Sequence, residues 1–325
     1  MKDKYSREID YLRISVTDRC NLRCKYCMPE KGIDMVSHKD VLSLEEIARI
    51  VQASTLVGVR KIRLTGGEPL IRKGISQLIA KINSMPEIDD LALTTNGITF
   101  AEQAEKLKQA GLKRVNFSLD SLRKDRFKFI TREGDLDKVL ESIEAAIKLD
   151  LKPVKINTVL IRDFNDDEIV QFANLTMEKS LHIRFIELMP IGTSQTWASG
   201  RFIPAQEVKD IIEIKLGRLD KIQKPKGNGP AQYYQFKGAI GTIGFISAIS
   251  EHFCSKCNRL RLTSTGGLRP CLYSDDEVDI RTALRCGASL KKLSEIIASS
   301  VQHKPKKHSA IGPGTYRSMM YQIGG

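Results

Sequence analysis

Residues 15–30, SVTDRCNLRCKYCMPE, contain Cys20, Cys24 and Cys27 in a CxxxCxxC pattern. Three thiolates at this spacing can hold three irons of a 4Fe-4S cube and leave the fourth iron open to a substrate or cofactor. Clusters of this type usually have four cysteine ligands. A triplet with no fourth thiol nearby therefore indicates chemistry at the cluster rather than simple electron storage. Spacing alone also allows a structural zinc site or isolated buried thiols.

The triplet follows the first of six short β-rich runs that alternate with helical segments. This alternation is typical of a β/α fold, and Ser43 with Glu46 marks one helix start as a capping box. Six units are two fewer than a closed barrel requires. We therefore predict an α/β fold, an incomplete parallel (β/α)6 TIM-like barrel over residues 1–222, with catalytic groups at the carboxyl ends of its strands. The expected strands are Leu12–Val16, Lys61–Thr65, Leu91–Thr95, Arg114–Leu119, Val154–Val159 and His182–Glu187.

Composition narrows the compartment and the kind of partner. The chain of 325 residues has 52 Lys plus Arg against 39 Asp plus Glu, a net charge of +13, which suits an anionic partner. No apolar run approaches the roughly 18 residues of a membrane span, and the N-terminus lacks the apolar core of a signal peptide. Seven cysteines without a secretion signal favour a reducing compartment. We expect a cytoplasmic protein with no membrane partner.

A second cysteine group lies in a smaller C-terminal α+β region, residues 223–325. Residues 223–232, QKPKGNGPAQ, are typical of a linker or exposed loop, and helices are expected near Glu277–Arg285 and Leu290–Ala298. The cysteines are Cys254, Cys257 and Cys271, again without an obvious fourth. A zinc ribbon completed by His252 or Cys286 is the alternative to a second cluster. Cys286 is otherwise expected to be a small buried hydrophobe.

Two arginines follow the CxxC pair. In an extended segment Arg259 and Arg261 project to the same face, because side chains alternate with period two. Guanidinium groups match phosphate oxygens bidentately, so this pair can bind a polyphosphate beside the second cysteine group. A solvated basic strand edge is the simpler alternative.

Two motifs together carry a resemblance. The CxxxCxxC triplet with Tyr26 before its last cysteine, and Thr65-Gly66-Gly67-Glu68-Pro69 downstream, resemble the radical S-adenosylmethionine (SAM) superfamily. The resemblance implies that the open iron is chelated by the amino and carboxylate groups of SAM. It also implies that GGEP closes the second strand against this cofactor. Glycines suit that position, since a backbone without Cβ can approach a ligand closely.

The likeness to one family of that superfamily, the GTP cyclases that begin molybdenum cofactor biosynthesis, runs from end to end. It rests on CNLRCKYCMP, RLTGGEPL, LTTNG, VNFSLDSL, VKINTVL, ELMP, FCSKCNRLRLT with its third cysteine, and the terminal Gly-Gly pair. It implies two 4Fe-4S clusters and SAM as cofactors. The implied reaction starts with a 5'-deoxyadenosyl radical, which abstracts the hydrogen at C3' of GTP, and it ends in 3',8-cyclo-7,8-dihydro-GTP. In this implied scheme the second cluster holds the guanine.

The resemblance also implies roles for individual residues. It implies that Cys20, Cys24 and Cys27 hold the cluster that binds SAM, and that Cys254, Cys257 and Cys271 hold the second cluster. The SAM contacts are Tyr26, Gly67, Ser118 and Met189. The GTP contacts are Arg13, Arg63, Thr94, Lys155, Arg259, Leu260 and Arg261. The terminal Gly324 and Gly325, which would ordinarily be a frayed end, are implied to reach into the active site, where Arg13 also acts.

The implied partners are GTP, a one-electron donor such as a flavodoxin-type reductant, the downstream cyclic pyranopterin monophosphate synthase and a second copy of the chain in a homodimer. Nucleic acid is not among them. Two alternatives stay open from the residues themselves. One is another radical SAM enzyme with an auxiliary cluster, such as a peptide maturase, whose C-terminal extension typically has more cysteines. The other is a basic zinc-ribbon protein that binds nucleic acid without catalysis.

Overall fold

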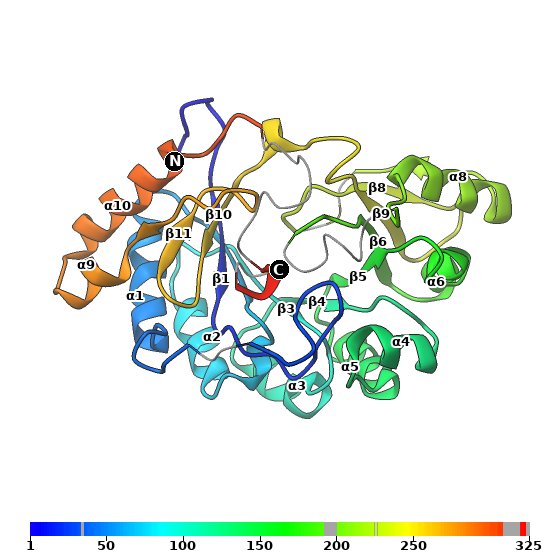
Figure 1. Ribbon diagram of the computed structural model, residues 1–325, viewed down its shortest axis with the longest axis horizontal. Helices are drawn as coiled ribbons and strands as arrows, with labels where there is room; N and C mark the ends of the chain where they lie inside the picture. Colours follow the sequence, from blue (N-terminus) through cyan, green and yellow to red (C-terminus); the bar gives the residue numbers. More distant parts are fainter. Residues whose placement is uncertain (34–35, 192–199, 224, 226, 308–318, 323–325) are drawn as a thin grey trace.

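The computed structural model describes residues 1–33, 36–191, 200–223, 225, 227–307 and 319–322 (Figure 1). Six parallel strands follow one another as neighbours in a single sheet. They are β1 (Tyr11–Ser15), β2 (Lys61–Thr65), β3 (Asp90–Thr95), β4 (Arg114–Ser118), β5 (Val154–Leu160) and β6 (Leu181–Glu187). The predicted parallel α/β core is confirmed, and each observed strand overlaps its predicted range.

Helices cover the outer face of this curved sheet, as Figure 1 shows. Their apolar sides pack onto the strands, which are apolar on both faces, as parallel strands flanked by helices are. The helices between the six strands are α1 (Leu44–Thr55), α2 (Ile75–Asn83), α3 (Phe100–Gln109), α4 (Lys124–Thr131), α5 (Leu136–Lys148) and α6 (Ile169–Glu178), with 3-10 turns Pro69–Ile71 and Asp166–Glu168. The capping box at the start of α1 is confirmed: Ser43 Oγ accepts from Glu46 N, and Glu46 Oε2 accepts from Ser43 N.

The C-terminal region adds strands to both edges of the six. Strand β9 (Thr242–Ile246) pairs in parallel with β6, and β10 (Arg259–Leu262) pairs in parallel with β1. Four short antiparallel strands continue outward on the two sides. They are β7 (Asp220–Lys221), β8 (Gln232–Gln235), β11 (Gly267–Arg269) and β12 (Val278–Asp279). The strands beyond residue 222 thus belong to the same sheet as the barrel strands, which the sequence did not predict.

The other helices of the described residues are α8 (Ala205–Leu216), α9 (Arg281–Arg285), α10 (Leu290–Gln302) and the 3-10 turns Cys254–Lys256 and Met320–Gln322. The helix expected over 277–285 is only half correct. Val278 is drawn into strand β12 by its pairing with Leu268, and the helix begins at Arg281. In the described part of the chain, no helix is both long enough and apolar enough to cross a membrane.

The segment expected to be a linker or exposed loop also differs from prediction. Asn228 is half-buried, and its Nδ2 donates to Asp90 Oδ2 at 2.6 Å. Asp90 begins β3 and accepts from Arg114 Nε at 2.7 Å on the neighbouring strand β4. Glycine and proline ruled out a helix or strand here, but they carry no information about burial. Asn228 thus lies against the amino end of β3.

Candidate active site

A cavity runs through the barrel from the carboxyl ends of the parallel strands, where the fold predicted the catalytic groups, to their amino ends. Cys257 lies at the amino end because it precedes β10, which is parallel to β1, and Cys271 lies there because it follows the antiparallel β11. It lies between the barrel strands and the segment 253–273. Three of the four predicted SAM contacts line it: Tyr26 of the first cysteine loop, Ser118 and Met189. The predicted GTP contacts that line it are Arg13, Arg63, Thr94, Arg259 and Arg261, and the cysteines that line it are Cys254, Cys257 and Cys271.

The first cysteine loop follows β1 and is braced by the end of α4. Arg23 N donates to Thr131 O at 3.0 Å, and Lys25 N donates to Ile130 O at 2.9 Å. The guanidinium of Arg132 donates to Arg23 O at 2.5 Å. These bonds hold the backbone between the cysteines from outside the cavity.

The thiols of this loop are buried close to one another. Burial and mutual repulsion raise the pKa of Cys24, burial raises that of Cys20 to about 11, and burial together with the charge of Cys20 raises that of Cys27 to about 12. Free thiols are thus stable here at neutral pH, and a bound metal would have to supply the charge that makes them thiolates. Tyr321, in the described C-terminal segment, donates a backbone hydrogen bond to Cys27.

The side chain of Tyr26 is anchored by Asp120. The Tyr26 hydroxyl donates to Asp120 Oδ2 at 2.6 Å, and Val159 N donates to Asp120 Oδ1 at 2.9 Å. Burial raises the pKa of Asp120 to about 6, although both hydrogen bonds lower it. Asp120 lies two residues after the end of β4, so one carboxyl connects the first cysteine loop to strands β4 and β5.

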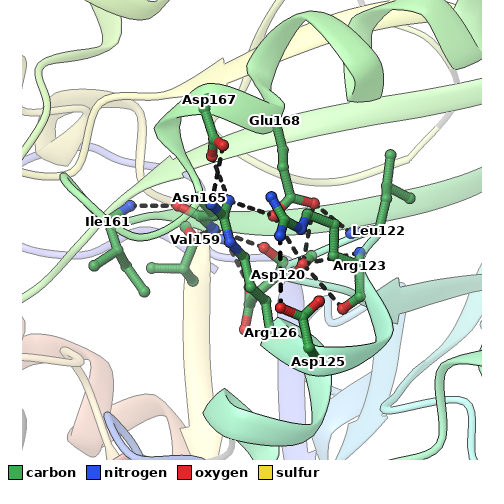
Figure 2. A network of polar contacts seen from close by, with 11 residues as sticks. Asp120, Leu122, Arg123, Asp125, Arg126, Val159, Ile161, Asn165, Asp167 and Glu168 are labelled. Atoms are coloured by element: carbon green, nitrogen blue, oxygen red, sulfur yellow. Dashed lines mark hydrogen bonds and ion pairs between the residues drawn. The ribbon is translucent and has the colours of Figure 1, made fainter.

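The polar network in Figure 2 fixes the loop that carries Asp120. Asn165 Nδ2 donates to the backbone oxygens of Asp120 (2.7 Å) and Val159 (2.9 Å). Glu168, which is fully buried, accepts from Leu122 N at 2.6 Å. The loops that follow β4 and β5 are therefore locked to each other directly beside Tyr26.

Removal of the Asp120 carboxyl tests this brace. Asp120→Ala leaves the buried Tyr26 O–H and Val159 N–H without their acceptor, and an unsatisfied buried donor costs about 1 to 3 kcal/mol. We expect the free energy of unfolding of the apoprotein, measured by urea denaturation, to fall by about 2 to 4 kcal/mol. The matched control is Asp125→Ala, whose carboxyl is 71% exposed and should change stability by less than about 0.5 kcal/mol. Equal losses in both variants would show that Asp120 is not a brace.

The GGEP turn packs against the same loop. A Cβ on Gly67 would lie 2.1 Å from Arg19 O, and one on Gly66, whose φ is +153°, would lie 2.5 Å from Thr17 O. Only glycine permits this contact between β2 and the start of the cysteine loop. The Glu68 carboxyl is buried and accepts from Thr95 Oγ1 (2.8 Å) and Asn96 N (2.7 Å), so it ties the turn to the end of β3.

The second cysteine group has the opposite electrostatic setting. Burial alone would raise the pKa of the Cys257 thiol, but the charges of Arg259 and Lys304 and hydrogen bonds from Arg259 lower it to about 6. The Arg259 guanidinium also lies 4.9 Å from the ring of Phe253. The lowered pKa favours the Cys257 thiolate, which is the form that binds iron or zinc.

Three arginines form a row across three neighbouring strands. Arg13 on β1 is in register with Arg261 on β10 and with Arg63 on β2. Residues in register on adjacent strands point to the same face of a sheet, and all three line the cavity. We call these three residues the arginine row.

The arginine row is electrostatically unfavourable on its own. Burial lowers the pKa of Arg63 to about 9, and Arg114 and Arg13 add to this effect, while Tyr11 opposes it. Burial, together with Arg13 and Arg259, lowers the pKa of Arg261 well below its usual value. Among the described residues that line the cavity, the basic ones are Arg13, Arg63, Arg184, Arg259, Arg261 and Lys304, whereas Asp120 is the one carboxyl. A polyanion would relieve this repulsion.

Other predicted residues lie outside the cavity wall. The side chain of Leu260 alternates away from its arginine neighbours into the core. Lys155 is buried beneath the cavity, where its Nζ donates to the Tyr233 hydroxyl at 3.2 Å. Cys286 is exposed in the turn after α9, so the expectation of a buried residue there is wrong. Gly324 and Gly325 lie outside the described residues.

The sequence missed further cavity residues. Arg184 and Asn157 line the cavity, and Arg184 Nε and Asn157 Oδ1 are buried without a hydrogen-bond partner among the described residues. Both lie on predicted strands, and the period-two alternation of β6 places Arg184 on the inner face with His182 and Ile186. That signal was available. Lys304 gave no signal, because its place depends on how the C-terminal segment packs.

The arrangement fits two thiolate-held clusters and an anionic ligand. Orphaned polar atoms face the cavity, the second cysteine trio lines it, and the loop of the first trio reaches it through Tyr26. No three His, Cys, Asp or Glu side chains of the described residues converge as the ligands of a single metal ion would. A four-iron cube makes no such demand, since each thiolate binds a different iron.

Comparisons with known proteins agree along the whole chain. A family model described as the Radical SAM superfamily matches residues 14–176, and one described as Molybdenum Cofactor Synthesis C matches residues 181–310. The chain is similar to proteins named GTP 3',8-cyclase: it is 55% identical over 325 residues to that of Pelotomaculum thermopropionicum and 55% identical over 325 residues to that of Desulforamulus reducens, with 100% of each chain covered.

Solved structures share the fold. Streptococcus suis SuiB bound to its precursor peptide SuiA has a TM-score of 0.64 at 12% identity, over 92% of this chain and 67% of that one. SuiB bound to S-adenosylmethionine has a TM-score of 0.61 at 14% identity, over 84% of this chain and 63% of that one. At this identity the likeness concerns the fold alone.

Proposed function

The chain belongs to the GTP 3',8-cyclase family of the radical SAM superfamily, and we propose that it converts GTP to (8S)-3',8-cyclo-7,8-dihydro-GTP, the first step of molybdenum cofactor biosynthesis. The observation that carries this proposal most directly is the arginine row. It faces a cavity whose described lining has a strong excess of positive charge. The same lining includes the proposed SAM contacts Tyr26, Ser118 and Met189 and the cysteines of the second trio. A triphosphate is the ligand that such a row suits.

The family uses SAM and 4Fe-4S clusters, and the proposal divides them between the two cysteine trios. Cys20, Cys24 and Cys27 would hold the cluster that binds SAM, with Tyr26, Gly67, Ser118 and Met189 as SAM contacts. Cys254, Cys257 and Cys271 would hold the second. When bound, SAM and its cluster supply the 5'-deoxyadenosyl radical that removes the hydrogen at C3' of GTP. Residues 1–222 would thus carry the radical chemistry, and residues 223–325 the second cluster.

The protein's own contribution is to position the substrate. Arg13, Arg63 and Arg261 would bind the triphosphate through charge-assisted hydrogen bonds, while the guanine would lie toward Cys254, Cys257 and Cys271. Fixing both ends of GTP sets its ribose against the SAM side of the cavity. Placement of this kind converts an encounter into an effectively unimolecular step.

The remaining predicted contacts have smaller parts in the proposal. Thr94 accepts from Arg63 Nη1 at 3.1 Å, which orients that guanidinium. Lys155 would add positive charge from below, Arg259 would orient the second trio, and Leu260 would contribute only its backbone. Met320 lines the cavity and Tyr321 contacts Cys27, which supports a C-terminal Gly324-Gly325 pair that reaches the reacting groups.

The proposed partners follow from the reaction. SAM cleavage requires one electron, so a flavodoxin-type donor would supply that electron to the cluster held by Cys20, Cys24 and Cys27. The product would pass to cyclic pyranopterin monophosphate synthase. We also propose that the enzyme works as a homodimer in the cytoplasm.

The test is anaerobic reconstitution followed by incubation with SAM, dithionite and each nucleoside triphosphate, with products identified by mass spectrometry. We expect about eight irons per chain, from two four-iron cubes, and a cyclised product with GTP alone. Zinc in place of iron would favour the nucleic-acid-binding alternative. SAM cleavage without a nucleotide product would favour a peptide maturase.

A further inference from the structure

The second cysteine trio is fastened to the first residues of the chain. Arg7 is buried, and its charge is matched by Asp3, whose Oδ2 accepts from Arg7 Nε at 2.6 Å. From this position Arg7 Nη1 donates to Cys254 O at 2.8 Å, and Nη2 donates to Pro305 O at 2.7 Å. Arg7 thus joins the first cysteine of the trio to the chain just after α10.

Lys304, next to Pro305, holds the rest of the trio. Its Nζ donates to Arg259 O at 2.8 Å and to Pro270 O at 2.5 Å. Arg259 lies two residues after Cys257, and Pro270 directly precedes Cys271. One ammonium group therefore joins the two chain segments that bring the second and third cysteines together.

The positive charge of Lys304 is buried, which is unfavourable in free energy. The side chain is 3% exposed and lines the cavity. Both of these acceptors are neutral carbonyls, whereas a buried ammonium needs an anion nearby. Burial lowers the pKa of Lys304, while Cys257 and Cys271 raise it and Arg259 and Arg7 lower it. The hydrogen bonds to Arg259 O and Pro270 O place this cation beside the segments that carry Cys257 and Cys271.

We propose that Lys304 is a positioning residue for the second trio, which pins the backbone beside Cys257 and Cys271 and makes the cluster there easier to reduce through its fixed positive charge. This rests on the proposed function, in which that trio holds a cluster. Reduction adds a negative charge to the cluster, and cluster potentials depend on nearby charge and hydrogen bonds. The hydrogen bonds of Lys304 hold its charge beside the trio, and charges interact more strongly inside a protein than in water.

The test separates charge from hydrogen bonding in the reconstituted full-length enzyme. Lys304→Gln keeps a donor and removes the charge, and Lys304→Arg keeps both. Lys306→Gln, two residues away and exposed, is the matched control for loss of one positive charge. Iron content is measured first, and then the midpoint potential of each cluster by an EPR-monitored redox titration with and without SAM, so that the signal SAM leaves unchanged identifies the second cluster.

We expect Lys304→Gln to make the midpoint potential of the second cluster more negative. The equilibrium constant for its reduction should fall at least about tenfold, which is about 59 mV for one electron. The potential of the first cluster should be unchanged in Lys304→Gln. In Lys304→Arg and Lys306→Gln, both clusters should keep the wild-type potentials. Loss of only the second four irons in Lys304→Gln, with Lys304→Arg intact, would equally support the positioning role. An unchanged potential in Lys304→Gln, or the same shift in Lys306→Gln, would overturn the inference alone. A wild-type enzyme with only four irons would instead overturn the proposed function.

Discussion

Arg261→Ala is expected to weaken GTP binding by about 1.5 to 3 kcal/mol, the usual worth of a hydrogen bond to a charged group. This corresponds to a loss of between about ten- and a hundredfold in affinity. The physical reason is the arginine row: Arg261 sits beside Arg13 in register, is 4% exposed, and has a charge that the cavity itself disfavours. Its guanidinium is therefore poised for an anion. Isothermal calorimetry of GTP with the anaerobically reconstituted enzyme measures the change.

A matched control separates this site effect from a general loss of positive charge. Arg218 is 87% exposed and pairs with Asp220 at 3.1 Å, far less buried than any member of the row. Arg218→Ala should leave GTP affinity unchanged, because an exposed charge is screened. SAM cleavage in the absence of GTP should be largely intact in both variants. If Arg261→Ala binds GTP as tightly as the wild type, the row does not hold the triphosphate.

The strands were predictable because their residue composition indicates that they are buried. Each of the six barrel strands is a short run rich in apolar and β-branched residues, as in VKINTVL at 154–160, and such runs are typical of parallel strands covered on both faces. The capping box of Ser43 and Glu46 was predictable for a similar reason, since both partners lie within one helical turn. Local patterns were sufficient wherever the cause was local.

The arginine row could not be derived in the same way. Arg13 and Arg261 come from opposite ends of the chain, and they meet only because β10 inserts beside β1 in a particular register. Period-two alternation predicted that Arg259 and Arg261 share a face, but it carried no information on which strand lies next to them. The position of β10 instead depends on the packing of the whole C-terminal region.

The linker expectation failed for a related reason. Gly and Pro at 223–232 predict irregular backbone, which the described residues before Gln232 bear out. Burial of Asn228 against Asp90 depends on a partner that is distant in the sequence and belongs to the amino end of β3. Asp120 and Lys304 are of the same kind, since each acts through residues brought near by the fold.

The two cysteine trios should fail differently when one ligand is lost. Cys20→Ser is expected to abolish SAM cleavage, because the proposed cluster of SAM would lose one of its three thiolates in a loop whose carboxyl neighbours already disfavour negative charge. Cys271→Ser is expected to leave SAM cleavage in place and to lower formation of cyclised GTP by at least about 100-fold, since a misplaced substrate costs about this much. Mass spectrometry of 5'-deoxyadenosine and of the cyclised nucleotide measures both steps in one reaction.

Cys286→Ser is the matched control for these variants, because that thiol is exposed and lies outside both trios. It should keep full activity and about eight irons per chain, whereas each of the other two variants should lose about four. The different expected effects on SAM cleavage and GTP cyclisation test whether the trios hold separate clusters. If both trios held one shared cluster, Cys20→Ser and Cys271→Ser would each lose SAM cleavage and cyclisation together. Full cyclase activity in reconstituted Cys20→Ser or Cys271→Ser would show that the trio concerned does not hold a cluster needed for the reaction.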